Sequence, residues 1–177
     1  MYVVVGLSNN HLWKTTDGGT TWRDITPSSS ASSGQTNISD IAVSDVDPNQ
    51  VWVTYSGVQT ACKVLKTTDG GTSWTNLTQP ILTMWPITKI VFQRGTGGGV
   101  YVGSHAGVFY RNNSMSNWQQ LGHGLPDMDI RFMFINYNVG KLRIGTSRGA
   151  WENDLYEVSK PMAQISASNN VVSAPNL

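Results

Sequence analysis

The stretch that decides the fold is Thr15-Thr16-Asp17-Gly18-Gly19-Thr20-Thr21-Trp22, which returns as Thr67-Thr68-Asp69-Gly70-Gly71-Thr72-Ser73-Trp74. A third octet, Arg111-Asn112-Asn113-Ser114-Met115-Ser116-Asn117-Trp118, keeps the tryptophan but neither the aspartate nor the glycines. The tryptophans follow one another at intervals of roughly 50 residues, which predicts one supersecondary unit per copy. Such a unit must pack against its neighbours to bury its apolar side chains.

Short apolar segments flank the octets in a constant order, and each has the length of a β-strand. One strand opens most units, two more lead into the octet, and a fourth follows it. This pattern predicts fourteen strands, or about three and a half four-stranded blades of an all-β propeller, and therefore an incomplete ring. The predicted strands are 38–43, 87–92 and 130–135; 3–6, 51–54, 100–103 and 142–145; 12–14, 64–66, 108–110 and 150–152; and 22–26, 74–78 and 118–121.

Composition supports short strands and excludes several functional classes. The chain of 177 residues contains 18 glycines, seven tryptophans and six tyrosines, and its only glutamates are Glu152 and Glu157. Twelve basic and 11 acidic side chains leave a net charge of +1, so nucleic-acid binding is not expected. No apolar stretch is long enough to insert into a membrane. The single Cys62 permits neither an internal disulfide nor a cysteine-based zinc site.

The two intact octets match the Asp-box motif, also called the bacterial neuraminidase repeat, and the chain resembles that family over about residues 2–155. The family includes sialidases, xyloglucan-type glucanases, sortilin-like receptors and secreted bacterial surface proteins. The resemblance implies a β-propeller and a secreted or cell-surface location. It also implies that the octets lie on one rim, and that ligands bind to loops on the opposite rim.

The octets can be explained by turn structure alone, without a catalytic or metal-binding role. An aspartate at the start of a tight turn can accept backbone N–H groups, and paired glycines supply a positive φ. The tryptophan would then cover the turn and anchor the outermost strand. We favour this interpretation over metal binding or acid–base catalysis by Asp17 or Asp69. The residues given this structural role are Thr15, Asp17, Gly19, Trp22, Thr67, Asp69, Gly71, Trp74 and Trp118.

Loops on the opposite rim are the expected ligand-binding region. They comprise 27–37, 79–86 and 122–129 between units, and 8–10, 55–61, 104–107 and 146–149 within units. Trp85 stands outside the strand pattern, so it is available to stack on a sugar ring or a protein partner. The alternative is that it fills the seam between two blades. The residues expected to share its rim, unless they are ordinary loop residues, are Tyr55, His105, Asp127, Asp129 and Arg148.

No metal or cofactor is expected. His105 and His123 could face each other but have no accompanying carboxylate pattern. Asp45, Asp47 and Asn49 resemble a calcium loop only faintly, because they lack its glycine and its distal glutamate.

Catalysis by this chain alone is not expected. A sialidase-like site needs clustered arginines, and the six arginines show no such pattern. An ordinary glycosidase needs two carboxylates across a cleft. The candidates are Asp40, Asp127 and Asp129, and Asp40 matches Lys89 and Arg131 in the repeat. The predicted function is a non-catalytic binding or scaffold module for a glycan or protein partner. The alternative is part of a sialidase- or glucanase-like glycoside hydrolase whose catalytic acids lie partly outside the chain.

The remaining expectations concern organisation. Residues 1–155 are assigned to the propeller blades and residues 156–177 to a linker or the start of a further β domain. Exposed strand edges invite association. The partners expected at the two ends are therefore further blades of a longer chain, or a second copy that closes the ring with seven blades in all.

Overall fold

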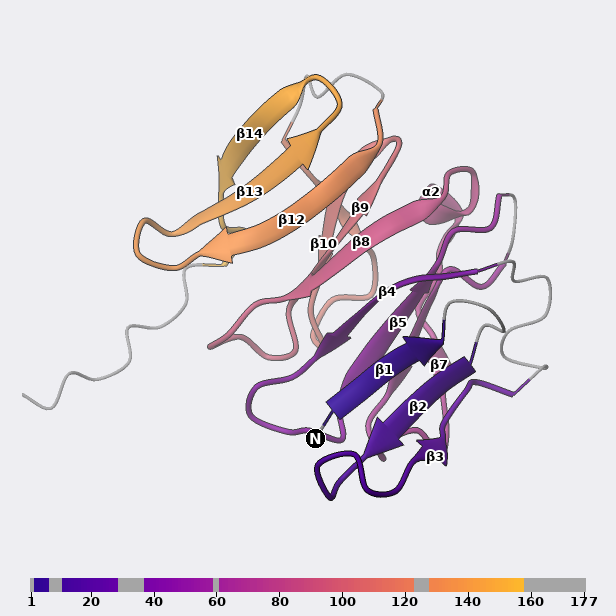
Figure 1. Cartoon of the computed structure of the whole chain (residues 1–177). Coiled ribbons are helices and arrows are strands. Elements are labelled where there is room, and N and C mark those ends of the chain that lie inside the picture. Colours follow the sequence, from indigo (N-terminus) through magenta and orange to yellow (C-terminus); the bar gives the residue numbers. More distant parts are fainter. Residues whose placement is uncertain (1, 7–10, 29–36, 59–60, 123–127, 158–177) are drawn as a thin grey trace, which may run out of the picture.

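The computed structural model describes residues 2–6, 11–28, 37–58, 61–122 and 128–157 (Figure 1). These residues form fourteen strands and one helical turn, so the predicted all-β fold is confirmed. Within them, no helix has the length and apolar character needed to cross a membrane.

The fourteen strands form four separate antiparallel sheets in chain order. Sheet 1 contains β1 (Tyr2–Gly6), β2 (His11–Thr15) and β3 (Arg23–Asp24). Sheet 2 contains β4 (Ile38–Val43), β5 (Val51–Tyr55), β6 (Val64–Thr67) and β7 (Thr75–Asn76). Sheet 3 contains β8 (Ile87–Phe92), β9 (Val100–Ser104), β10 (Gly107–Arg111) and β11 (Gln119–Leu121). Sheet 4 contains β12 (Ile130–Asn136), β13 (Lys141–Thr146) and β14 (Gly149–Asp154).

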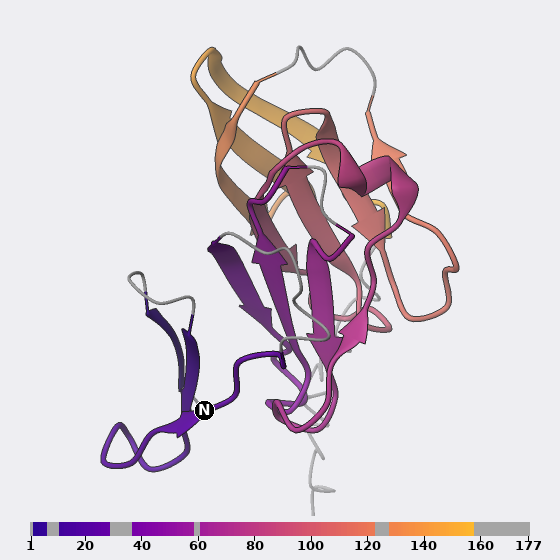
Figure 2. The same cartoon turned by 90° about the vertical axis from the view of Figure 1, so that its right-hand side faces the viewer.

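Each sheet is a simple meander, because every strand pairs with the next one along the chain. The sheets stand side by side like blades (Figures 1 and 2), and β4, β8 and β12 lie next to one another on the inner side. We call the side that carries the octet turns the octet rim. The side that carries the connections between sheets is the opposite rim.

Three apolar cores fill the junctions between consecutive sheets. Leu12 and Ile25 of sheet 1 pack against Val53 and Leu65 of sheet 2. The second core joins sheets 2 and 3 and includes Trp52. The third joins sheets 3 and 4 and contains Tyr101, Val108, Tyr110, Ile130, Leu142 and Ile144. Inward-facing side chains alternate along each strand, as in other stacked sheets.

The inner strands share one irregularity. The pairing register of β4 shifts between Ile38 and Asp40, that of β8 between Ile87 and Lys89, and that of β12 between Ile130 and Phe132. Asp40, Lys89 and Phe132 are therefore equivalent. The predicted match of Asp40 with Arg131 is wrong by one residue, because Arg131 occupies the bulge itself.

Two further details differ from the sequence prediction. The strands after the octets are shorter than expected and begin after the tryptophan. The segment between β7 and β8 contains a helical turn, α2 (Pro80–Thr83), with proline at its first turn.

Candidate functional site

The first octet turn is held by its own side chains. The hydroxyl of Thr15 donates to Asp17 Oδ1 (2.8 Å) and accepts the N–H of Gly19 (2.9 Å). Asp17 in turn accepts the backbone N–H and the hydroxyl of Thr21, at 2.9 and 2.6 Å. These bonds from Thr21 and Thr15 lower the pKa of Asp17 to about 2. The carboxylate is fully engaged in the turn, which suits a structural role.

The second octet turn repeats this network. Asp69 Oδ1 accepts the N–H groups of Thr72 and Ser73 at 2.9 Å, and Asp69 Oδ2 accepts the Ser73 hydroxyl at 2.6 Å. Thr67 again accepts a glycine N–H, that of Gly71, at 2.9 Å. The hydrogen bonds from Ser73 and Thr67 hold the pKa of Asp69 well below its usual range.

The octet tryptophans have a role that the sequence did not indicate. Only Trp22 bonds to its own turn, through the Gly19 carbonyl at 3.0 Å. Trp74 Nε1 donates instead to the Ile25 carbonyl of sheet 1 (3.1 Å), and Trp118 Nε1 donates to the Leu77 carbonyl of sheet 2 (2.8 Å). These two side chains therefore join each sheet to the end of the outermost strand of the sheet before it.

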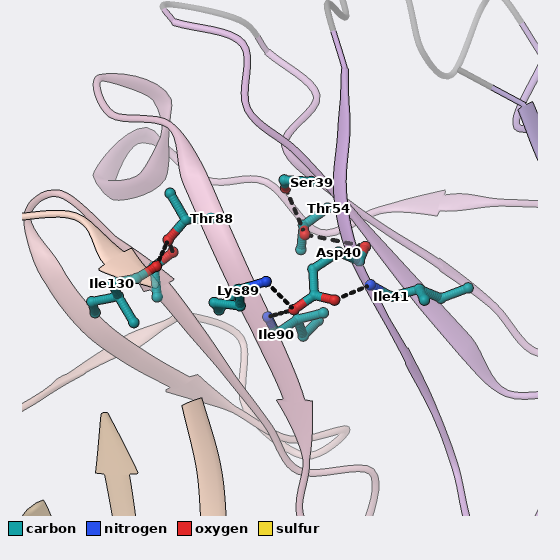
Figure 3. Close-up of polar contacts among 9 residues, drawn as sticks. Ser39, Asp40, Ile41, Thr54, Thr88, Lys89, Ile90 and Ile130 are labelled. Carbon is teal, nitrogen blue, oxygen red and sulfur yellow. Dashed lines mark hydrogen bonds and ion pairs between the residues drawn. The ribbon is translucent and has the colours of Figure 1, made fainter. Parts of the chain in front are cut away.

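Asp40, one of the candidate catalytic acids, also joins two sheets (Figure 3). Its Oδ2 accepts the backbone N–H of Ile90 in β8 at 3.0 Å and lies 3.8 Å from the Lys89 ammonium. Its Oδ1 accepts the N–H of Ile41 at 2.9 Å. β8 is the edge strand of sheet 3, so the Ile90 N–H, which faces away from β9, is available for this bond. The Asp40 carboxylate thus links sheet 2 to sheet 3, which is a structural role.

The next junction uses a different side chain. The Thr88 hydroxyl donates to the carbonyl of Ile130 in β12 at 2.7 Å (Figure 3). Thr88 is equivalent to Ser39, whose hydroxyl lies 2.9 Å from that of Thr54 within sheet 2. The bulge residue Thr88 and the residue after the bulge in β4, Asp40, therefore supply polar contacts between the inner strands.

On the opposite rim, the structure brings together three of the predicted binding residues. The Trp85 ring stacks on the His105 ring, with centroids 5.5 Å apart and an interplanar angle of 26°. His105 Nδ1 lies 2.9 Å from Asp129 Oδ1, close enough for a hydrogen bond that fixes the imidazole. Trp85 is 43% exposed and Asp129 is also exposed. These three residues form the rim cluster, which spans the connection before β8, the β9–β10 turn and the connection before β12.

A buried lysine fixes the position of Trp85. Lys63 is fully buried, and its ammonium donates to the carbonyls of Trp85 (2.7 Å) and Gly57. Burial lowers the pKa of the Lys63 ammonium. Two carbonyl oxygens partly replace the water that this ammonium has lost. Lys63 therefore ties the β5–β6 loop to the loop that carries Trp85. Sequence reasoning missed it, because a single lysine before a strand carries no recognisable signal.

The other predicted site residues lie elsewhere. Tyr55 is buried in the core between sheets 1 and 2, with 2% of its surface exposed, so its side chain is not presented on the rim. Arg148 is exposed in the β13–β14 turn, where its N–H donates to the Thr146 hydroxyl at 3.1 Å. Asp127 and His123 lie outside the described residues.

The faint calcium loop is a turn in this structure. Asp47 Oδ1 accepts the N–H of Asn49 at 2.9 Å, and Asp47 Oδ2 bonds to the Gln50 amide at 3.3 Å. Across the part of the chain that the structure describes, no group of three or more histidine, cysteine or carboxylate side chains is arranged to hold a metal ion.

Comparison with solved structures identifies similar folds. YCF48, in a structure described as bound to a D1 peptide, is 20% identical with a TM-score of 0.59; the match covers 88% of this chain and 48% of that one. The GH74 xyloglucanase from Xanthomonas campestris is 14% identical with a TM-score of 0.62, over 80% of this chain and 25% of that one. A GH74 enzyme from Niastella koreensis is 14% identical with a TM-score of 0.60, over 85% and 27%.

No family model and no curated protein matches the chain. The chain spans less than half the length of the solved structures it resembles. At these identities the likeness concerns the fold alone. The comparisons and the four stacked sheets together establish that this chain is a segment of a β-propeller.

Proposed function

We propose that the chain is a non-catalytic binding module of a secreted or cell-surface protein, and that the rim cluster is the centre of its binding surface. The observation that carries this proposal is the stacked pair of Trp85 and His105. The exposed ring of Trp85 is held by the carboxylate-bound ring of His105, and its backbone carbonyl is held by the buried Lys63 ammonium, so it is already fixed before it meets a ligand. A fixed aromatic side chain loses little conformational entropy on binding.

A protein segment is the ligand that this surface fits best. The turn that leads into Trp85 also exposes Ile81 and Met84, so the tryptophan extends an apolar patch. Exposed apolar patches with aromatic and methionine side chains are typical of protein-binding surfaces. The structure of YCF48 bound to a D1 peptide is consistent with this use of the fold. A glycan remains the competing ligand, because a tryptophan face also stacks on sugar rings.

The alternative function is part of a glycoside hydrolase, and the similarity to two GH74 enzymes is the observation that favours it. It requires two carboxylates facing one cleft. Asp40 is bound to the N–H of Ile90 and Asp129 is bound to His105, which leaves neither placed as a free acid. We therefore rank binding above catalysis.

The proposal includes partners at both end sheets. Trp13 and Trp22 are exposed at sheet 1. Phe132 and Phe134 of β12 are exposed at sheet 4. Each copy brings four sheets, two of them three-stranded, so two copies would supply eight sheets and not seven complete blades. Further blades, from a longer chain or from another copy, would cover these faces. Light scattering of the purified chain should reveal self-association, whereas a monomer would favour additional blades of the same polypeptide.

The decisive experiment compares two exposed tryptophans. The chain would be screened against a displayed library of random peptides and against a glycan array, together with the Trp85→Ala and Trp22→Ala variants. Trp22 has the same exposure, 43%, but lies on the octet rim. Peptide binding lost in Trp85→Ala and retained in Trp22→Ala would support the proposal. Glycan binding with the same dependence would identify a sugar ligand. Binding insensitive to Trp85 would disprove a site at the rim cluster.

A further inference from the structure

A pocket lies between sheets 2 and 3 on the octet rim, away from the rim cluster. It has a volume of about 230 Å³. Its walls include Lys66 of β6, Arg111 at the end of β10 and the buried ring of Trp52. Two hydroxyl-bearing residues of sheet 2, Thr68 and Thr75, also line it. The pocket therefore gathers two cations and several hydrogen-bond donors over an aromatic floor.

The charges in this pocket are not balanced. Lys66 and Arg111 are half-buried, and none of the described residues that line the pocket carries a carboxylate. Burial lowers the pKa of both groups, and the nearby guanidinium lowers that of Lys66 further. Two like charges in a partly dehydrated site repel each other and raise the free energy of the empty pocket.

The present contacts leave most of the donors unused. The Lys66 ammonium donates to Asn113 Oδ1 at 2.7 Å and lies 5.0 Å from the centre of the Trp52 ring. Arg111 Nη1 donates to the Leu77 carbonyl at 3.4 Å. An ammonium has three donors and a guanidinium five, so both groups retain donors for a further acceptor.

The altered third octet accounts for this arrangement. Arg111 occupies the position of Thr67, and Asn113 occupies that of Asp69. In the intact octet those side chains bond to each other and close the turn. Here Asn113 accepts from Lys66 of the neighbouring sheet instead. The substitutions that abolish the octet turn are therefore the ones that build the pocket.

The wall formed by Asn113 is held from behind. Its N–H donates to the Gly97 carbonyl at 3.0 Å. Gly98 has a φ of +78°, and a Cβ added there would lie 2.4 Å from Asn113 Nδ2. Only glycine allows the β8–β9 loop to approach this side chain so closely. The pocket is thus shaped by fixed backbone as well as by long side chains.

We propose that this pocket binds one tetrahedral oxyanion, a sulfate or phosphate group, either as a free ion or as an ester. A single such group supplies the missing negative charge and enough oxygen acceptors for Lys66, Arg111 and the two threonine hydroxyls. The pocket has room for such a group and for part of an ester attached to it, and Thr68 and Thr75 in its walls are exposed to solvent. This site does not depend on the function proposed for the opposite rim.

The test is a titration of the purified chain with sodium sulfate, with sodium chloride adjusted to keep the ionic strength constant. Heat of binding and thermal unfolding would both be recorded. The variants are Arg111→Thr, which restores the residue of the intact octets, and Lys66→Met, which keeps an unbranched side chain. The control is Lys14→Met, because Lys14 is equivalent to Lys66 but lies 3.5 Å from Asn49 at a different junction.

We expect saturable sulfate binding that is weakened at least about tenfold in Arg111→Thr and Lys66→Met and unchanged in Lys14→Met. Without sulfate, Lys66→Met should melt at or above the temperature of the parent chain, because it removes a repulsion. Inorganic phosphate and methyl phosphate, compared at a pH where both are dianions, test the ester: equal binding indicates an ester group as ligand, and weaker binding of methyl phosphate indicates a free ion. The proposal is overturned if sulfate binding is absent, or if it persists in both variants.

Discussion

The indole Nε1 of Trp74 lies 3.1 Å from the carbonyl oxygen of Ile25, so the octet of one sheet is bonded to the outermost end of the sheet before it. Trp118 makes the same contact with Leu77 one junction later. The same indole-to-carbonyl hydrogen bond therefore links sheet 2 to sheet 1 and sheet 3 to sheet 2. In sheet 1 the equivalent Trp22 bonds to its own turn and is exposed.

Replacement of Trp118 by phenylalanine should therefore cost more than the same change at Trp22. The Trp118→Phe variant leaves the Leu77 carbonyl without its indole donor and removes buried ring atoms, so we expect a loss of about 2 kcal/mol in the free energy of unfolding. Trp22→Phe should cost less than about 0.5 kcal/mol, as is usual for exposed positions. Urea unfolding of both variants measures the difference, and equal losses would contradict a role at the junction.

The octet carboxylates should make stability depend on acid. In the folded chain the pKa of Asp17 is lowered from 3.8 to about 2, and that of Asp69 is also lowered. A lowered pKa means that the stabilisation is complete above the unfolded value and is lost as the pH falls through the folded value. Melting temperatures should thus fall between about pH 4 and pH 2.

The double variant Asp17→Asn/Asp69→Asn should melt a few degrees lower at pH 7 and show a shallower fall in acid. Asp45→Asn, at an exposed turn, serves as the control and should keep the profile of the parent chain. A double variant with an unchanged acid profile would show that the two turns do not control it.

The stabilising effect of Asp40 should depend on how many carboxylate or amide oxygens its side chain offers as acceptors. The Asp40→Ala variant leaves the Ile90 N–H unpaired at the junction of sheets 2 and 3, which should cost about 1–2 kcal/mol. Asp40→Asn keeps one oxygen acceptor and should cost less. Chemical unfolding ranks the three proteins, and an Asn variant as unstable as the Ala variant would assign the effect to the charge.

Two glycines with similar backbone angles should respond differently to alanine. Gly18 has a φ of +73° and no atom within 4 Å of an added Cβ, so Gly18→Ala should cost about 1 kcal/mol from backbone strain alone. Gly71 has a φ of +94°, and its added Cβ would lie 2.4 Å from Ile25 Cβ. Gly71→Ala should therefore cost at least about 2 kcal/mol more, since the junction core must also move. Similar thermal shifts in both variants would argue against this contact.

Much of the fold could be read from local chemistry. The turns of the two intact octets could be predicted, since Asp17 and Asp69 accept hydrogen bonds from backbone N–H groups only four residues further along the chain. The strands between them follow from alternating apolar residues, and their number is confirmed. The partner of Asp40 could not be predicted, because the Ile90 N–H lies 50 residues away on the edge strand of the next sheet.

The candidate site was predictable only in part. Trp85 and His105 stood out as loop residues of the right kind, but their stacking depends on how sheets 2 and 3 meet. Lys63 gave no signal, because its role comes from full burial beneath two loops. Arg111 was visible as a departure from the octet, yet its meaning required Lys66 on the adjacent sheet.

The separation of the apolar core into three junctions has a consequence for how the chain comes apart. Among the residues that the structure describes, each core joins one sheet to the next in sequence, and no single core contacts all four sheets. Such a molecule behaves as a short linear array, in which the outer members can fray while the middle pair stays intact. Sheets 2 and 3 each pack against a neighbour on both faces, so we expect them to be the last part of the chain to unfold. The Trp85–His105 pair lies on that pair of sheets.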